Sequence, residues 1–154
     1  MRLQGIQQLV AAMERQLAHV YLLSGDEPLQ LGEAADQVRS SARLAGYSSR
    51  IVMEAGTRFD WNQLAQEANS MSLFAEQKII DLRIPSGKPG REGSAALSAY
   101  CERAPEDTLL LITLPKLDKS QLGSKWFRAL ERIGASLQLW PIERQRLPGW
   151  IGQR

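Results

Sequence analysis

Apolar and polar positions along the chain repeat with two periods, one typical of helices and one typical of strands. Apolar residues that recur every three to four positions predict helices at residues 5–18, 28–45, 60–68, 94–103 and 120–133. Short runs rich in apolar residues predict strands between them at residues 19–23, 50–54, 77–84, 108–114 and 136–140. Such alternation favours a sheet covered by helices on both faces. The predicted class is therefore α/β, a three-layer α/β/α fold with a mainly parallel five-stranded sheet.

One connector does not follow the usual polar composition of turns. Met71, Leu73 and Phe74 fall between the predicted helix at 60–68 and the predicted strand at 77–84. Connectors normally lie on the surface, where they carry binding residues more often than core residues. These three side chains are therefore interpreted as a docking element, and the alternative is a small satellite core folded back on the domain.

The first strand, turn and helix have the setting of a phosphate-binding loop but lack its residues. Such a loop needs backbone N–H groups and a lysine around the phosphates, whereas Asp26 and Glu27 would repel them and Pro28 has no N–H to donate. A second candidate, Gly87-Lys88, is followed by Pro89 instead of Ser or Thr. The pattern disfavours ATP hydrolysis and suggests an interaction protein on an α/β scaffold.

Other chemistry is poorly supported by the composition. A catalytic triad or a zinc site needs several imidazoles or thiolates, and the chain has one histidine, His19, and one cysteine, Cys101. The longest apolar runs are far shorter than the ~20 residues of a membrane span. With 44% apolar and 23% charged residues, the composition is that of an ordinary globular protein, and we expect a cytoplasmic location.

Charge is unevenly distributed along the chain. Residues 1–118 hold 12 Lys+Arg and 15 Asp+Glu, whereas residues 119–154 hold 7 and 2, so a region of −3 is followed by one of +5. A basic segment can face nucleic acid or an acidic partner. The alternative function is therefore a nucleic-acid-binding module that uses the basic C-terminal quarter, with these residues on or near one helix: Lys116, Lys119, Lys125, Arg128 and Arg132.

Five stretches, taken in their order and spacing, resemble the delta subunit of bacterial DNA polymerase III, the clamp-loader component that opens the sliding clamp. The stretches are Tyr21–Leu29, Met71–Ala75, Asp107–Ile112, Lys125–Leu130 and Leu147–Ile151. The resemblance implies an AAA+-like (P-loop NTPase-like) fold without a functional P-loop. It also implies a clamp-binding element, in which Leu73 and Phe74 enter a hydrophobic pocket of the clamp, formed by Ser70, Met71, Ser72, Leu73 and Phe74. It implies no catalytic residue, cofactor or metal.

The same resemblance predicts how the chain is organised and what it binds. Residues 1–142 are expected to form the AAA+-like clamp-binding domain, and residues 143–154 to begin a truncated second (lid) domain. The expected partners are the sliding clamp (beta subunit) and, through missing C-terminal domains, the other clamp-loader subunits, with DNA contacted only indirectly or weakly and no membrane. The full-length protein would be a non-catalytic subunit of DNA polymerase III, a DNA-directed DNA polymerase, acting in DNA replication.

Overall fold

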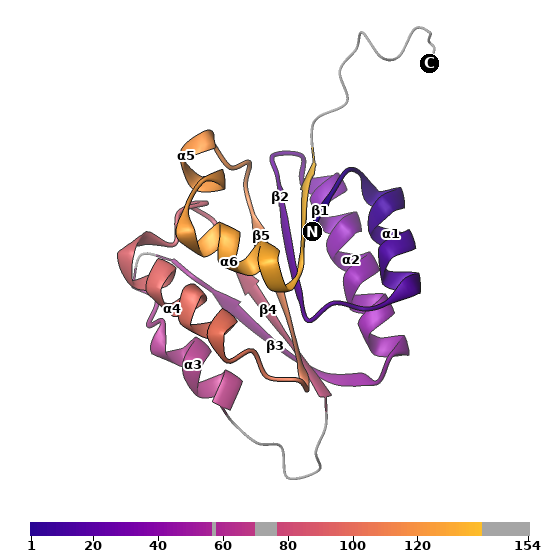
Figure 1. The fold of residues 1–154 in the computed structure, drawn as a ribbon, viewed down its shortest axis with the longest axis horizontal. Helices are drawn as coiled ribbons and strands as arrows, with labels where there is room; N and C mark the ends of the chain where they lie inside the picture. The colour runs from indigo at the N-terminus through magenta and orange to yellow at the C-terminus, as the bar shows by residue number, and fades with distance from the viewer. Residues whose placement is uncertain (57, 70–76, 140–154) are drawn as a thin grey trace, which may run out of the picture.

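A single parallel sheet lies between two layers of helices in the computed structural model, which describes residues 1–56, 58–69 and 77–139 (Figure 1). The strands are β1 (Arg2–Leu3), β2 (Val20–Gly25), β3 (Tyr47–Glu54), β4 (Gln77–Arg83), β5 (Thr108–Leu114) and β6 (Ala135–Leu139). The helices are α1 (Ile6–Arg15), α2 (Pro28–Leu44), α3 (Asn62–Asn69), α4 (Gly90–Glu102), α5 (Lys119–Leu122) and α6 (Lys125–Ile133). The predicted three-layer α/β architecture is confirmed.

The strands follow the order β1-β6-β2-β5-β4-β3, and every neighbouring pair is parallel. β5 lies at the centre, as its continuous apolar run predicts, because a strand buried on both faces carries apolar residues at successive positions. Leu109 and Leu111 point to one face of the sheet, and Leu110 and Ile112 point to the other.

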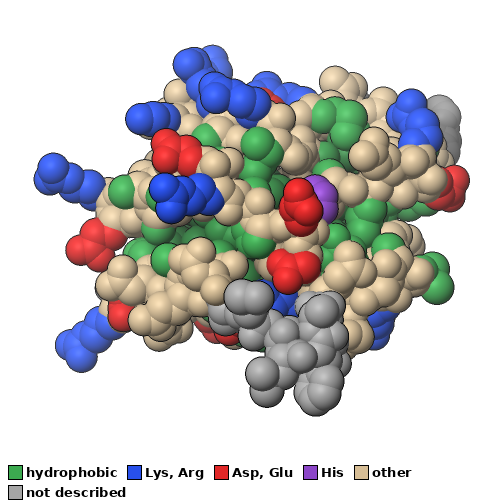
Figure 2. All heavy atoms as spheres, turned by 60° about the horizontal axis from the view of Figure 1, so that its bottom comes forward, with side chains coloured by type: hydrophobic (Ala, Val, Ile, Leu, Met, Phe, Trp, Pro, Cys, Tyr) green, Lys and Arg blue, Asp and Glu red, His purple; other side chains and the backbone are tan. Residues whose placement is uncertain are grey.

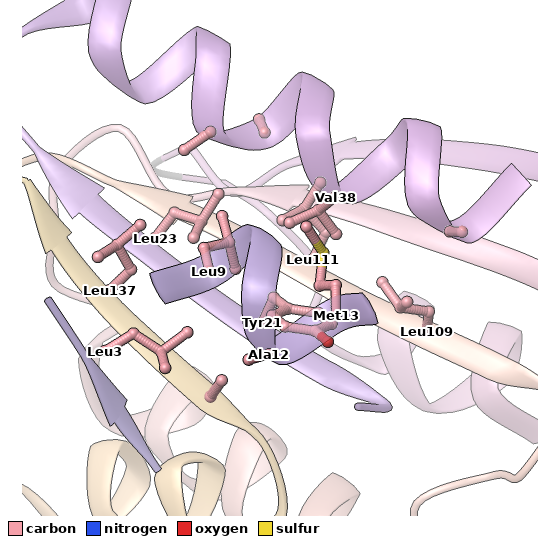
Figure 3. Close-up of a cluster of buried hydrophobic side chains, with 14 of the residues drawn as sticks. Leu3, Leu9, Ala12, Met13, Tyr21, Leu23, Val38, Leu109, Leu111 and Leu137 are labelled. Atoms are coloured by element: carbon pink, nitrogen blue, oxygen red, sulfur yellow. The ribbon is translucent and has the colours of Figure 1, made fainter. Parts of the chain in front are cut away.

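Each face has its own hydrophobic cluster. On the first, α1 and α2 cover β2 and β5, and Figure 3 shows Leu9 of α1 and Val38 of α2 over Leu23 and Leu111. On the second face, three helices bury apolar side chains against β2, β4 and β5; these side chains are Leu64 of α3, Leu97 and Tyr100 of α4, and Trp126, Phe127 and Leu130 of α6.

The prediction of five strands is wrong by one, because β1 adds a sixth. β1 has only two residues, which is too short to show an alternating pattern. It pairs with β6, and its Leu3 side chain is buried in the first cluster. Arg2 fixes the same strand from outside, since its Nε donates a hydrogen bond to the Glu131 carboxylate at 2.8 Å.

Two predicted helix boundaries also differ from the structure. The single helix expected at 120–133 is two helices, because α5 ends before Gly123 and the Ser124 hydroxyl oxygen then accepts a hydrogen bond from the Phe127 N–H to cap α6. α4 begins at Gly90, before residue 94, where the pattern predicts its start. The predicted end of the last helix at residue 133 is confirmed, since α6 ends at Ile133 and Gly134 is its C-cap.

Gly134 is required by close packing between α6 and β2. A Cβ atom at this position would lie 2.2 Å from the Val20 carbonyl oxygen, well inside van der Waals contact. Any side chain would therefore push β6 away from β2. In the described part of the chain no helix is both long and apolar enough to cross a membrane. Residues 140–154, including the predicted start of a second domain at 143–154, lie outside the described residues.

Candidate functional site

Because all the strands are parallel, the sheet has one amino edge, where strands begin, and one carboxyl edge, where they end. In open α/β sheets, ligands bind most often outside the carboxyl ends of the strands. In this chain the turn between β2 and α2 lies at the carboxyl edge, whereas the junction between α3 and β4 lies at the amino edge (Figure 1).

The turn between β2 and α2 is closed by carboxylates. The Glu27 side chain accepts a hydrogen bond from the Leu29 N–H at 2.9 Å and so caps the N-terminus of α2. Pro28 is the first residue of the helix, and Asp26 Oδ1 accepts from the Lys116 N–H at 2.9 Å. The N–H groups that would cradle a phosphate thus face negative charge, as expected from the prediction that Asp26 and Glu27 would repel phosphates.

β4 carries a buried carboxylate that sequence analysis overlooked. Asp81 is fully buried on the α2 side of the sheet, where Arg39 donates to its Oδ2 at 3.0 Å and Arg50 at 3.2 Å. Arg83 lies 3.6 Å from Oδ1. An aspartate inside the apolar run at 79–82 was the available signal. Since this carboxylate is surrounded by guanidinium groups, it is a structural ion-pair centre joining α2, β3 and β4.

No metal centre is visible in the part of the chain that the structure describes, since no three His, Cys, Asp or Glu side chains come together there. Cys101 is half-buried on α4, and burial raises the pKa of its thiol to about 11. His19 lies exposed directly before β2, where its carbonyl oxygen accepts the Leu110 N–H at 2.8 Å.

The predicted clamp-binding residues Ser70, Met71, Ser72, Leu73 and Phe74 lie outside the described residues. The structure describes the elements on either side of them, α3, which ends at Asn69, and β4, which begins at Gln77. Figure 2 turns this region toward the viewer and shows acidic side chains gathered near the single histidine.

An ion pair joins these two elements. The Lys78 ammonium donates to the Glu67 main-chain carbonyl oxygen at 2.5 Å and to its carboxylate at 2.9 Å. Lys78 also pairs within the sheet, where its N–H donates to the Asp107 carbonyl oxygen at 3.0 Å. A lysine at the amino end of an apolar strand was the only sequence signal for this contact, and sequence analysis did not use it.

A groove of about 720 Å³ runs between α3 and α4 and ends beside Asn69. Its floor is formed by small side chains, including Ala65, Ala68 and Ala99. Close approach of the two helices depends on Gly93, where a Cβ atom would lie 2.6 Å from the Trp61 ring. The Tyr100 hydroxyl at this groove is buried without a hydrogen-bond partner among the described residues, and burial raises its pKa.

The basic residues of the alternative reading are only partly brought together. Lys125, Arg128 and Arg132 lie exposed on α6 and line a second groove, of about 450 Å³, against α4. Lys119 belongs to the separate helix α5, and Lys116 precedes it in the loop where its N–H contacts Asp26. The predicted single basic helix is therefore divided.

Comparison with solved structures identifies the fold. The fold matches a Bacillus subtilis DNA clamp loader delta protein with a TM-score of 0.67 and 15% identity, covering 92% of this chain and 44% of that one. It also matches a DNA polymerase III gamma subunit-related protein from Thermotoga maritima with a TM-score of 0.55 and 11% identity, covering 92% and 47%. This chain thus shares the α/β fold of these two proteins, with carboxylates in the turn between β2 and α2.

Sequence comparison then identifies the family. The family model for the delta subunit of DNA polymerase III matches residues 21–138. The chain is 30% identical over 148 residues to DNA polymerase III subunit delta of Escherichia coli (strain K12), covering 96% of this chain and 43% of that protein. It is 28% identical over 151 residues to the Haemophilus influenzae subunit delta, covering 96% and 44%. The chain belongs to the DNA polymerase III delta subunit family and spans less than half the length of these relatives.

Proposed function

We propose that this chain binds the sliding clamp of the bacterial replication machinery and favours its open form, without hydrolysing ATP. The observation that carries the proposal is the family match, which runs through residues 70–74. Leu73 and Phe74 would enter a hydrophobic pocket of the clamp, flanked by Ser70, Met71 and Ser72. Clamp opening would then draw on binding free energy, since a ligand shifts a conformational equilibrium only by its differential affinity for the two states.

The carboxyl edge supports the non-enzymatic part of the proposal. Glu27 occupies the helix N-terminus at which a phosphate would bind, and Asp26 adds a second negative charge beside it. The proposed location of the protein is the cytoplasm, together with the replication machinery. Assembly with other clamp-loader subunits would need the part of the relatives' length that this chain does not cover.

The experiment is the affinity of this chain for the matching clamp, compared with that of the Leu73→Ala/Phe74→Ala double variant. Burial of the two side chains contributes roughly 3–6 kcal/mol gross, from which the ordering of the connector must be subtracted. We expect the double variant to keep the wild-type circular dichroism spectrum and to bind at least about tenfold more weakly.

The chain offers a matched control. Leu29 is a large apolar residue that is 83% exposed, and it lies at the start of α2, at the carboxyl edge of the sheet. The Leu29→Ala variant removes exposed apolar surface at the carboxyl edge of the sheet, away from the α3–β4 junction, and should bind the clamp as the wild type does. Equal binding by the Leu73→Ala/Phe74→Ala variant would refute the proposed site.

The groove between α4 and α6 favours a second candidate, nucleic-acid binding. Lys125, Arg128 and Arg132 line it, and none of the three pairs with an acidic side chain among the described residues. Phosphate contacts make binding steeply salt-dependent. DNA binding that weakens strongly between low and moderate salt, and that survives the Leu73→Ala/Phe74→Ala change, would support this candidate.

A further inference from the structure

α3 obtains its C-terminal positive charge from a different element. The last four carbonyl groups of a helix have no partner within it, and a cation near them is stabilising. α3 has no basic residue in its last turn, yet the Lys78 ammonium of β4 lies 2.5 Å from the carbonyl oxygen of Glu67. The carboxyl end of α3 is therefore fastened directly to the amino end of β4.

The burial of this lysine is not explained by stability alone. The Lys78 side chain is only 9% exposed, and it lies on the sheet face where Ile80 and Leu82 belong to the hydrophobic cluster. Desolvating an ammonium group offsets most of the gain from its partner, so an apolar residue of similar size is often as stabilising as a buried ion pair. Unlike an apolar contact, an ion pair also fixes the distance and the direction between the two groups that it joins.

We propose that Lys78 is a positioning residue for clamp binding. By joining Glu67 to the second residue of β4, it sets the separation and direction of Asn69 and Gln77, the two residues that bracket the proposed clamp-binding element. This inference rests on the proposed function. It assigns Lys78 no contact with the clamp, only control over the frame from which Leu73 and Phe74 are presented.

Loss of the Lys78–Glu67 ion pair would reduce the fraction of molecules that are arranged for clamp binding. Apparent affinity falls in proportion to the fraction of molecules in the competent arrangement. Without Lys78, α3 and β4 remain packed through Leu64 and Ile80, with Ala68 against the same cluster, but the last turn of α3 loses the two hydrogen bonds that fix its direction relative to β4. The bound complex keeps the same clamp contacts, so the loss appears in the association rate and the dissociation rate stays the same.

The test is the kinetics of clamp binding by the Lys78→Met variant, measured on immobilised clamp. Methionine matches the apolar stem of the lysine side chain and removes the ammonium group. We expect association to slow by about tenfold, the equivalent of ordering one or two side chains, with an unchanged dissociation rate and a wild-type urea midpoint. Arg2→Met, which removes the Arg2–Glu131 ion pair at β1, is the matched control and should leave both rates unchanged.

A second variant keeps the test decisive if Lys78→Met fails to fold. Glu67→Ala removes the carboxylate from a helix position that suits alanine and leaves the bond from Lys78 to the carbonyl oxygen. It should slow association by a smaller factor, about threefold. Wild-type association rates in both folded variants, or a faster dissociation with normal association, would overturn the inference.

The proposed function and this inference fail in distinguishable ways. If the Leu73→Ala/Phe74→Ala variant binds clamp as the wild type does, the proposed site is wrong whatever Lys78→Met shows. If that double variant loses binding while Lys78→Met and Glu67→Ala associate normally, the site stands and only the positioning role of Lys78 is refuted.

Discussion

At each edge of the sheet a charged side chain caps the end of a helix, and the two charges are opposite in sign. At the carboxyl edge, the Glu27 carboxylate caps the N-terminus of α2, and the Asp26 carboxylate accepts the Lys116 N–H of the loop after β5. At the amino edge, Lys78 places an ammonium against the carbonyl end of α3. The comparison shows that a shared α/β fold does not determine which edge functions, because capping groups decide which helix ends remain open to a ligand.

The largest expected effect concerns the packing that supports the amino edge. Gly134→Ala would force a Cβ atom against the Val20 carbonyl oxygen, at the place where β6 enters the sheet beside β2. We expect a loss of about 3 kcal/mol or more in the free energy of unfolding, measured by urea denaturation.

A glycine in open space provides the control for that prediction. Gly32 lies on the exposed side of α2, and a Cβ atom there would meet nothing within 4 Å. Gly32→Ala should stabilise the protein by about 0.5–1 kcal/mol. A loss below about 1 kcal/mol in Gly134→Ala would mean that β6 can shift away from β2 without disturbing the sheet.

An intermediate effect is expected at the carboxyl edge. Glu27→Ala removes the side-chain cap of α2 and should lower the free energy of unfolding by about 1 kcal/mol. Clamp affinity should not change, because the cap is at the edge of the sheet opposite to the C-terminus of α3 and to Lys78. Urea denaturation and clamp binding on the same preparation would check both expectations. A loss of clamp affinity would show that the carboxyl edge also contributes to clamp binding.

A smaller effect should depend on pH. Burial alone would raise the pKa of Glu131, but hydrogen bonds from Arg2 and Ser136 outweigh it and lower the pKa below its usual value. A carboxylate with a lowered pKa stabilises the folded state above its unfolded pKa of about 4.3. This contribution is lost as the pH falls through the folded value.

Removal of that carboxylate isolates the effect. In Glu131→Gln, the difference in unfolding free energy from the wild type should be present at pH 7 and should shrink below about pH 4.3. Its size should stay under about 1 kcal/mol, because Arg2 is largely exposed and solvent screens the pair. A difference that is constant from pH 7 to pH 3 would contradict the assignment.

The last prediction is that the chain does not bind ATP. A fluorescent ATP analogue should show no saturable binding to the wild-type chain, because carboxylates occupy the helix N-terminus that would hold its phosphates. The Glu27→Ala variant should also fail to bind it, since the loop still contains Pro28 and no phosphate-binding lysine. Saturable binding of the ATP analogue by either protein would show that the N-terminus of α2 is open to a phosphate and would contradict the contrast between the two edges.

Sequence patterns predicted the helices and strands well where an element was long enough to show a repeating pattern of apolar residues. The helix at 28–45 and the strand at 108–114 agree closely with α2 and β5, because both contain strong apolar patterns between clear boundaries. β1 was missed because its two residues have no readable period. The break at Gly123-Ser124 was missed because both flanking helices carry apolar residues at compatible spacing, and the capping bond of Ser124 decided the boundary.

The candidate site was predicted less completely than the fold. The composition of the turn at 24–28 was sufficient to predict negative charge at the α2 N-terminus, because the relevant groups are neighbours in sequence. The pairs Lys78–Glu67 and Asp81–Arg39 join different elements, and sequence spacing does not reveal such contacts. Only the packing of helices on the sheet brings these charges together. The role of residues 70–74 stays a prediction.

The position of β6 has a consequence for how the protein is made. β6 lies between β1 and β2, so the first two strands to be synthesised are separated in the sheet by the last described one. β1 pairs with β6 through Arg2 and Leu3, so this pairing forms only after Ser136 and Leu137 have been synthesised. Pairings between distant parts of a chain form slowly. The β1 edge of this sheet is therefore completed late in folding, by a contact between residues more than 130 positions apart.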